Sequence, residues 1–140
     1  MGRFVRGSVV VVNYFFTDLS SSKRRPAVVV ADLEGDDLII CPIVSSRSDR
    51  YSVRVTSQDI AGGQLRNDSF IRPNILNTVD SSRILYSLGT LSSEKMWDID
   101  QKLREISWDM KHHWAEIISS RPLGEIASST ALEGRRQNRP

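Results

Sequence analysis

The chain has 140 residues, of which 39% are apolar and 26% charged, and its formal net charge is +2. This length fits one domain and excludes a second hydrophobic core, while the mild positive charge allows a nucleic-acid partner. No apolar run reaches the roughly 18 residues of a membrane span, and the first six residues open no signal-peptide core, so we expect a cytoplasmic protein. The single cysteine, Cys41, excludes an internal disulfide and reads as a small core residue.

The first half of the chain reads as strands divided by polar loops. Runs of β-branched and other apolar residues predict three buried strands, at 7–16, 26–33 and 38–44. Serines and charged residues predict loops at 18–25 and 45–50. The alternation at 51–56 predicts a half-buried strand, because successive side chains of a strand point to opposite faces.

The second half begins with short strands, predicted at 69–72 and 84–89, and so completes the pattern of a small β-barrel. The period then changes, and apolar residues three, four or seven apart predict a helix that begins at Ser92 or Ser93. If helical to Ile118, this element is about 38 Å long, so we expect its distal half, with Trp114, to extend past the barrel toward a partner or a second copy. The domain is therefore predicted to span 1–118, and 119–140, rich in Ser, Pro, Gly and Arg, to be a flexible tail.

A basic run, Lys23-Arg24-Arg25, stands directly before Pro26 and the apolar strand that follows it. Proline suits a strand start or edge, so the guanidinium of Arg25 is expected at the mouth of the sheet. An arginine in that position can bind a phosphate through two parallel hydrogen bonds. On this segment alone, a solvated basic loop before a strand is the favoured reading, because basic runs usually form solvated faces.

Several segments around this run occur in a recognisable order. They are 7–19, the run Lys23-Arg24-Arg25-Pro26, then 40–46, Gly62-Gly63, 69–74, 78–80 and 88–92. This series resembles the MazF/PemK family of toxins from bacterial toxin-antitoxin pairs, and the resemblance covers roughly residues 5 to 107. It implies an SH3-like small β-barrel with a C-terminal helix.

The resemblance also implies an activity and its residues. The family's members cut single-stranded RNA without a metal or other cofactor: the 2′-hydroxyl attacks the phosphorus and leaves a 2′,3′-cyclic phosphate and a 5′-hydroxyl. Arg25 matches the family's catalytic arginine, and Arg72 matches an arginine that acts in one branch of it. Ser45 is the hydroxyl nearest to a family threonine, whose own place is taken here by Val44. The residues expected to bind RNA are Lys23, Arg24, Ser46, Arg47, Asn74, Phe16 and Asp18.

Two departures leave the general base unassigned. Val44 carries no hydroxyl, and Ser45 would point to the opposite face of a regular strand. Asn74 stands where the Arg72-type branch has an aspartate, and an amide cannot accept that proton. Asp18 and Asp68 are the remaining candidates for the base, whereas His112 and His113 lie on the late helix and read as surface or interface residues.

The resemblance implies three partners: single-stranded RNA, a cognate antitoxin and a second copy of the chain in a homodimer. We expect no membrane partner. Two alternatives stay open. One is a catalytically weakened barrel that binds nucleic acid or antitoxin, which Val44 and Asn74 favour. The other is a topoisomerase poison of the related CcdB type, for which the pair Arg25 and Arg72 would have no use.

Overall fold

The computed structural model describes residues 4–15, 22–45 and 48–120, and at residues 14, 15 and 22 it describes the backbone alone. The chain forms two compact units, divided after Arg104. The first holds the described strands and the start of the helix, and the second continues the helix. Among the described residues, no helix is long and apolar enough to cross a membrane.

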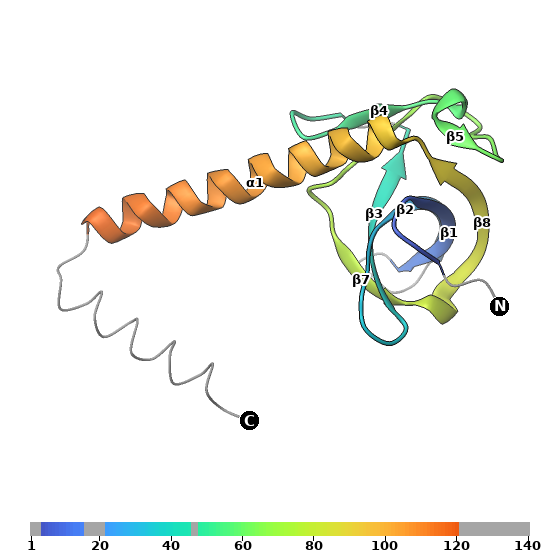
Figure 1. The fold of residues 1–140 in the computed structure, drawn as a ribbon, viewed down its shortest axis with the longest axis horizontal. Helices are drawn as coiled ribbons and strands as arrows, with labels where there is room; N and C mark the ends of the chain where they lie inside the picture. Colours follow the sequence, from blue (N-terminus) through green and yellow to red (C-terminus); the bar gives the residue numbers. More distant parts are fainter. Residues whose placement is uncertain (1–3, 16–21, 46–47, 121–140) are drawn as a thin grey trace. The chain divides into compact units, whose positions relative to one another are not determined.

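Eight antiparallel strands of the described chain form one curled sheet in the first unit (Figure 1). Their bounds are β1 Ser8–Phe15, β2 Ser22–Asp32, β3 Asp37–Val44, β4 Val53–Val55, β5 Ile60–Ala61, β6 Ser69–Ile71, β7 Asn77–Asp80 and β8 Ile84–Leu91. They follow the order β4-β6-β3-β2-β1-β8-β5, and β7 pairs with β3. The helix α1 runs from Ser93 to Ser120. The predicted fold class, a small β-barrel with a C-terminal helix, is confirmed.

The central strands are buried on both faces, which explains their nearly continuous apolar sequence. In β2, Val28 and Val30 join one core with Met96 and Ile99 of α1, while Ala27 and Val29 join a second core with Ile40. Cys41 belongs to the first core, and burial raises the pKa of its thiol to about 12. Its reading as a core residue is therefore confirmed.

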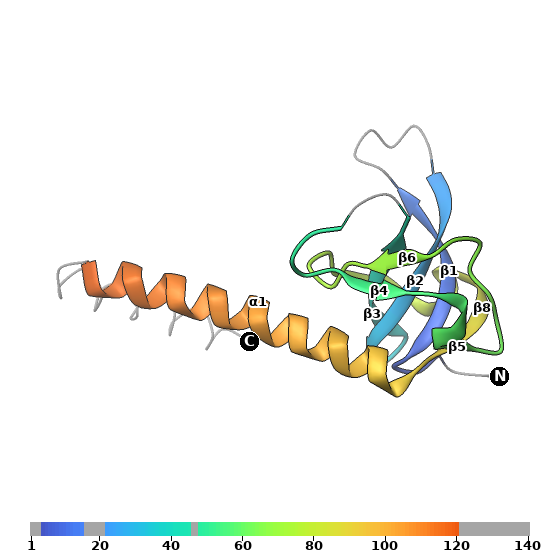
Figure 2. The same ribbon diagram turned by 90° about the horizontal axis from the view of Figure 1, so that it is seen from above.

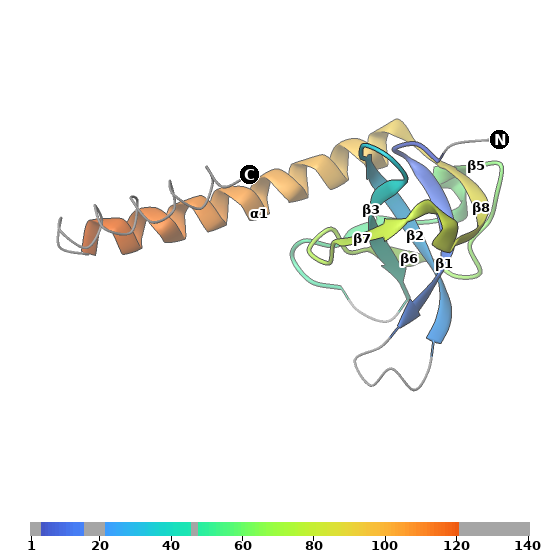
Figure 3. The ribbon, with the colours of Figure 1, turned by 90° about the horizontal axis from the view of Figure 1, so that it is seen from below.

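Strand β2 begins earlier than predicted, and the expectation of a loop over 18–25 is wrong for residues 22–25. Lys23, Arg24 and Arg25 pair with β1 as part of a long hairpin, although their charge reads as loop in the sequence. Pro26 lies inside this strand, opposite Val11. It is tolerated because the ladder with β3 begins only at Ala27, so no β3 carbonyl needs a donor from residue 26. Figures 2 and 3 show the β1–β2 hairpin projecting on the side of the barrel where β3 ends.

Two short strands, β5 and β7, and two 3₁₀ turns, Ser57–Asp59 and Ser81–Arg83, lie where the sequence predicts no element. A turn at Gly62 and Gly63 follows β5, and Gly62 has a positive φ of 86°. Gly63 packs so closely on β8 that a Cβ there would lie 1.5 Å from the Leu88 carbonyl oxygen. The absence of a side chain at Gly63 thus lets the segment that contains β5 lie against β8.

Helix α1 begins where its sequence predicts. The Ser92 carbonyl accepts the Met96 N–H, and the Ser92 hydroxyl accepts the Lys95 N–H. Met96 and Ile99 are buried, and an ion pair between Arg6 and Asp100 joins the N-terminal segment to this part of the helix. In the second unit Trp108, Met110 and Trp114 are exposed.

Candidate active site

Arg25 in β2 and Arg72, directly after β6, lie on the same face of the sheet, with β3 between the two strands. Ala27 of β2 is opposite Pro42 of β3, and the Pro42 carbonyl accepts the Arg72 N–H at 3.0 Å directly after β6. Residues opposite one another share a face, and Arg25 is two residues from Ala27, so both arginines lie on the face that holds Ala27. Two strand spacings and two residues along β2 put their Cα atoms on the order of 12 Å apart. Two long side chains at that separation can reach a common phosphate.

Both arginines are partly buried rather than extended into solvent. The side chain of Arg72 is 17% exposed, and the Nε atoms of both are shielded from solvent. Within the described residues, Arg72 Nε has no hydrogen-bond partner. Burial lowers the local dielectric, which strengthens the interaction of a guanidinium with an anion.

Asp49, which the sequence does not single out, lies at the centre of the hydrogen bonds around Arg72. Its Oδ2 accepts Arg72 Nη2 at 2.8 Å and Asn74 Nδ2 at 3.2 Å. Its Oδ1 accepts the Tyr51 N–H at 2.9 Å and the Ser52 hydroxyl at 3.3 Å. The Tyr51 N–H and then Arg72 hold the pKa of Asp49 below the ordinary aspartate value. Asp49 is therefore an ionised anchor that joins the loop after β3 to the turn after β6.

Sequence reasoning could find only half of this arrangement. An aspartate with a serine three residues later, here Asp49 and Ser52, indicates a local turn in which the side chains form hydrogen bonds with nearby backbone groups. That turn is present, because the Asp49 N–H also donates to the Ser52 hydroxyl at 2.8 Å. The contact with Arg72, 23 residues away in the sequence, depends on the pairing of β3 with β6.

The remaining described candidates fall on different faces. Lys23 and Arg24 are exposed, and alternation along β2 puts Lys23 on the face of Arg25 and Arg24 on the opposite face. Val44, opposite Phe70, has the parity of the arginine face. Ser45 follows the end of β3 and is exposed.

A family model for the PemK-like, MazF-like toxin of type II toxin-antitoxin systems matches residues 5–107. The chain belongs to this toxin family. The matched segment contains both arginines and Asp49, and it ends within α1. No curated protein matches the chain by sequence comparison.

Solved structures with a similar fold include MazF from Deinococcus radiodurans, with a TM-score of 0.61 and 17% sequence identity. The match covers 76% of this chain and 97% of the MazF chain. The MazE–MazF complex of the same organism matches with a TM-score of 0.59 and 18% identity, and the match covers 75% of this chain and 96% of the other. An endoribonuclease in complex with its cognate antitoxin, from a mycobacterial species, matches with a TM-score of 0.57 and 14% identity. That match covers 74% of this chain and 91% of the other. At these identities the likeness establishes the fold.

Four predicted site residues of this toxin-family chain, Phe16, Asp18, Ser46 and Arg47, lie outside the described residues. Asp68, a candidate base, pairs with Arg54 at 3.1 Å on the exposed surface. That contact ties it to β4, at the end of β6 away from Arg72.

The two histidines of the toxin-family chain lie in the second unit, and both are exposed. The ring of His112 packs against Trp108 with 4.1 Å between centroids. The surface reading of the histidines is thus confirmed. No three His, Cys, Asp or Glu side chains in the described parts of the chain lie close enough together to hold a metal ion.

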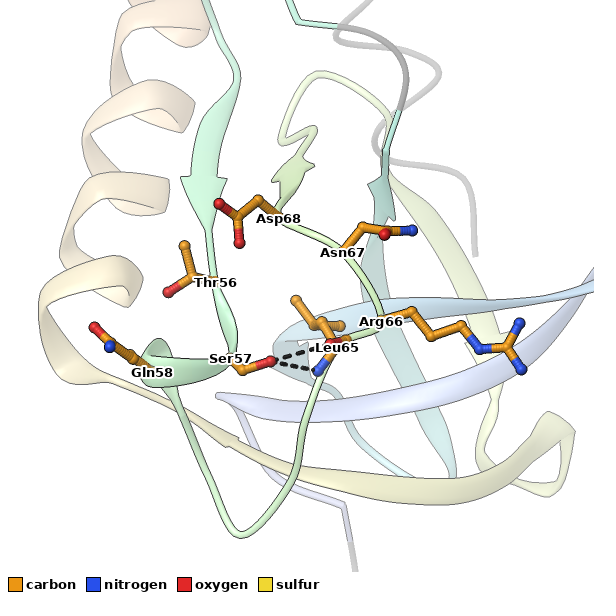
Figure 4. Close-up of a pocket in the computed structure, with 7 residues that line it drawn as sticks. All are labelled: Thr56, Ser57, Gln58, Leu65, Arg66, Asn67 and Asp68. Carbon is orange, nitrogen blue, oxygen red and sulfur yellow. Dashed lines mark hydrogen bonds between the residues drawn. The ribbon is translucent and has the colours of Figure 1, made fainter.

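A separate polar pocket lies beside β4 and the loop before β6 (Figure 4). It is lined by Thr56, Ser57, Gln58, Leu65, Arg66, Asn67 and Asp68. The Ser57 hydroxyl donates to the Leu65 carbonyl at 3.1 Å and accepts the Leu65 N–H at 2.9 Å, which fixes the loop against the 3₁₀ turn. Figure 4 shows Arg66 extending away from Asp68. The pocket contains neither arginine of the candidate active site.

Proposed function

We propose that the chain is a sequence-specific endoribonuclease toxin that cleaves single-stranded messenger RNA without a metal ion. The observation that carries this proposal is that Arg25 and Arg72 lie partly buried on one face of the sheet, on either side of β3. We infer that two such long side chains can bind one phosphate between them. Membership of the toxin family and the likeness to proteins described as endoribonucleases support it.

The chemistry that fits two arginines is attack of the 2′-hydroxyl on the adjacent phosphorus. A new P–O bond forms to O2′ as the 2′-hydroxyl proton passes to solvent, and the bond to O5′ breaks as O5′ takes up a proton. The products are a 2′,3′-cyclic phosphate and a 5′-hydroxyl. Negative charge grows on the phosphoryl oxygens in the transition state, so fixed guanidinium donors stabilise it more than the ground state. We assign Arg25 to this stabilisation and to the protonation of O5′, and Arg72 to the second side of the phosphate. Ser45, at the end of β3, is proposed to hydrogen-bond the same phosphate.

The RNA strand is proposed to continue along the β1–β2 hairpin. Lys23 lies on the face of Arg25 and offers a positive charge to the next phosphate. We extend this surface to Arg24, Ser46, Arg47, Phe16 and Asp18. Near Arg72, Asn74 offers amide contacts, and the half-buried rings of Tyr51 and Phe70 suit the stacking of unpaired bases.

A cognate antitoxin and a second copy of the chain are the proposed protein partners. Two of the similar structures are complexes of a toxin with its antitoxin. An acidic antitoxin segment lying over Lys23, Arg25 and Arg72 would block the RNA surface. Messenger RNA as the substrate implies action in the cytoplasm, and the proposal includes no membrane partner.

A catalytically weakened barrel that binds nucleic acid or antitoxin is the second candidate. Three observations favour it: Val44 has no hydroxyl, Asn74 cannot act as a base, and Asp49 already pairs with Arg72. The topoisomerase poison gains no comparable support, since it has no need of two arginines facing one phosphate.

The products of cleavage test the proposal. Incubation of the purified protein with a long mixed RNA in excess EDTA should give fragments whose new 5′-hydroxyl a polynucleotide kinase can label directly. Strict dependence on Mg²⁺ or a 5′-phosphate on those fragments would contradict the 2′-hydroxyl mechanism. Absence of cleavage with retained RNA binding would favour the weakened barrel.

A further inference from the structure

The Asp49 carboxylate has no acceptor capacity left for a substrate. A carboxylate offers about four lone-pair sites. In this structure four donors use them: Arg72 and Asn74 on Oδ2, and Tyr51 and Ser52 on Oδ1. A general base must accept the proton of the 2′-hydroxyl, so Asp49 could act as one only by losing an existing hydrogen bond.

The loop that carries Asp49 is also held from its other side. The Arg50 carbonyl accepts Lys102 Nζ at 2.8 Å, from the part of α1 that belongs to the first unit. The Arg50 guanidinium lies over the Tyr51 ring, 4.8 Å from its centroid. The Ser52 N–H closes the turn on the Asp49 carbonyl at 3.1 Å. The loop that carries Asp49 is thus held in place by contacts on either side of this residue.

These contacts restrict Arg72 at two points. Its backbone N–H is fixed to Pro42 of β3, and its Nη2 is fixed to Asp49. An arginine side chain has several rotatable bonds, so an anchor at the guanidinium removes freedom that a backbone hydrogen bond alone would leave. The same carboxylate oxygen also orients the Asn74 amide beside it.

We propose that Asp49 is a positioning residue, whose carboxylate fixes the Arg72 guanidinium and the Asn74 amide for contact with the scissile phosphate. This role rests on the proposed RNA cleavage. Asp49 acts through Arg72. It does not accept the proton of the 2′-hydroxyl, and it does not block the phosphate from binding Arg72. The Asp49 carboxylate offsets part of the positive charge of Arg72, but it also holds the guanidinium in a fixed position.

Asp49→Asn tests the role, with Asp100→Asn as the matched control. The new amide keeps one acceptor oxygen, which the neighbouring Tyr51 N–H and Ser52 hydroxyl are expected to hold, so its NH2 group faces Arg72 and the guanidinium loses its anchor. Asp100→Asn breaks another aspartate–arginine pair, with Arg6, in which the carboxylate is about as exposed as that of Asp49. We expect the single-turnover cleavage rate at saturating RNA to fall about 10- to 100-fold in Asp49→Asn, the scale for a misplaced catalytic group. The half-saturating RNA concentration should change much less, and Asp100→Asn should cleave at the wild-type rate.

Three results would overturn the role. Unchanged cleavage would show that Arg72 needs no anchor. Tighter RNA binding and faster cleavage would show that Asp49 blocks the site. Loss of the acid limb of the pH–rate profile in Asp49→Asn, with its shape otherwise kept, would identify Asp49 as the base.

A measurement on the protein alone separates this inference from the proposed function. The exchange of the Arg72 Nε proton with solvent, followed by NMR, should be slow in the wild type, because that atom is buried, and faster in Asp49→Asn. Asp100→Asn should leave it slow. If the wild type cuts no RNA, the proposed function fails, and a proton that exchanges equally in all three proteins would separately overturn the anchor.

Discussion

Asp49 and Arg72 show how one ion pair joins two loops that surround a candidate active site. The aspartate is held first by a backbone N–H of its own turn and then by the arginine, so its ionised form is favoured from two directions. The local turn would keep the carboxylate in place even without the arginine. The arginine, in contrast, has no second carboxylate contact among the described residues.

The titration of Asp49 follows from this order of causes. By NMR, its pKa should lie below that of an ordinary aspartate, and Arg72→Ala should raise it without bringing it fully back, since the Tyr51 N–H remains. Because the folded pKa is depressed, Asp49 stabilises the fold above its unfolded pKa and loses that effect as the pH falls through the folded pKa. A pKa that returns to the ordinary value in Arg72→Ala would show that the turn contributes nothing.

Among the secondary-structure elements, the sequence predicts the strands and the helix in which buried apolar residues follow a regular pattern. Val9 to Val12 and the run after Pro26 form strands as predicted, and the spacing of Met96, Ile99 and Leu103 predicts the helix. The start of β2 is missed because Lys23 and Arg24 have the composition of a loop, whereas their structure comes from pairing with β1. Strand β7 is missed because its residues are mostly polar and exposed, and only its ladder with β3 makes it a strand.

Gly63→Ala tests the contact between the β5 turn and β8. A Cβ at residue 63 would lie 1.5 Å from the Leu88 carbonyl oxygen and 2.7 Å from its carbonyl carbon, both backbone atoms that move only with the strand. We expect the free energy of unfolding in a denaturant titration to fall by about 3 kcal/mol, near the upper end of the usual range for overpacking.

Gly62→Ala is the control, since its Cβ would meet nothing within 4 Å and only its positive φ is unfavourable. Its expected loss is about 1 kcal/mol, the scale of a left-handed backbone conformation for a non-glycine residue. Equal losses in the two variants would show that β8 yields to the new methyl group.

For the whole molecule, the site is only partly predictable from sequence. Arg25 and Arg72 are identified from the motifs around them, and the strand register then brings them to one face. Asp49 could not be found in this way, because its partners in the site, Arg72 and Asn74, come from a segment more than twenty residues further along the chain. The general base is not assigned by either approach, since Asp68 pairs with Arg54 and Asp18 lies outside the described residues.

The most direct test of the account is the RNA cleavage rate of Arg25→Ala at saturating substrate, with Arg54→Ala as the exposed-arginine control. If Arg25 stabilises charge in the transition state, its loss should lower the rate by about 10² to 10³ with the fold intact by circular dichroism. Arg25→Lys should not restore the wild-type rate, because an ammonium cannot reproduce the two-point contact of a guanidinium. Cleavage by Arg25→Ala at the wild-type rate would contradict the proposed active site.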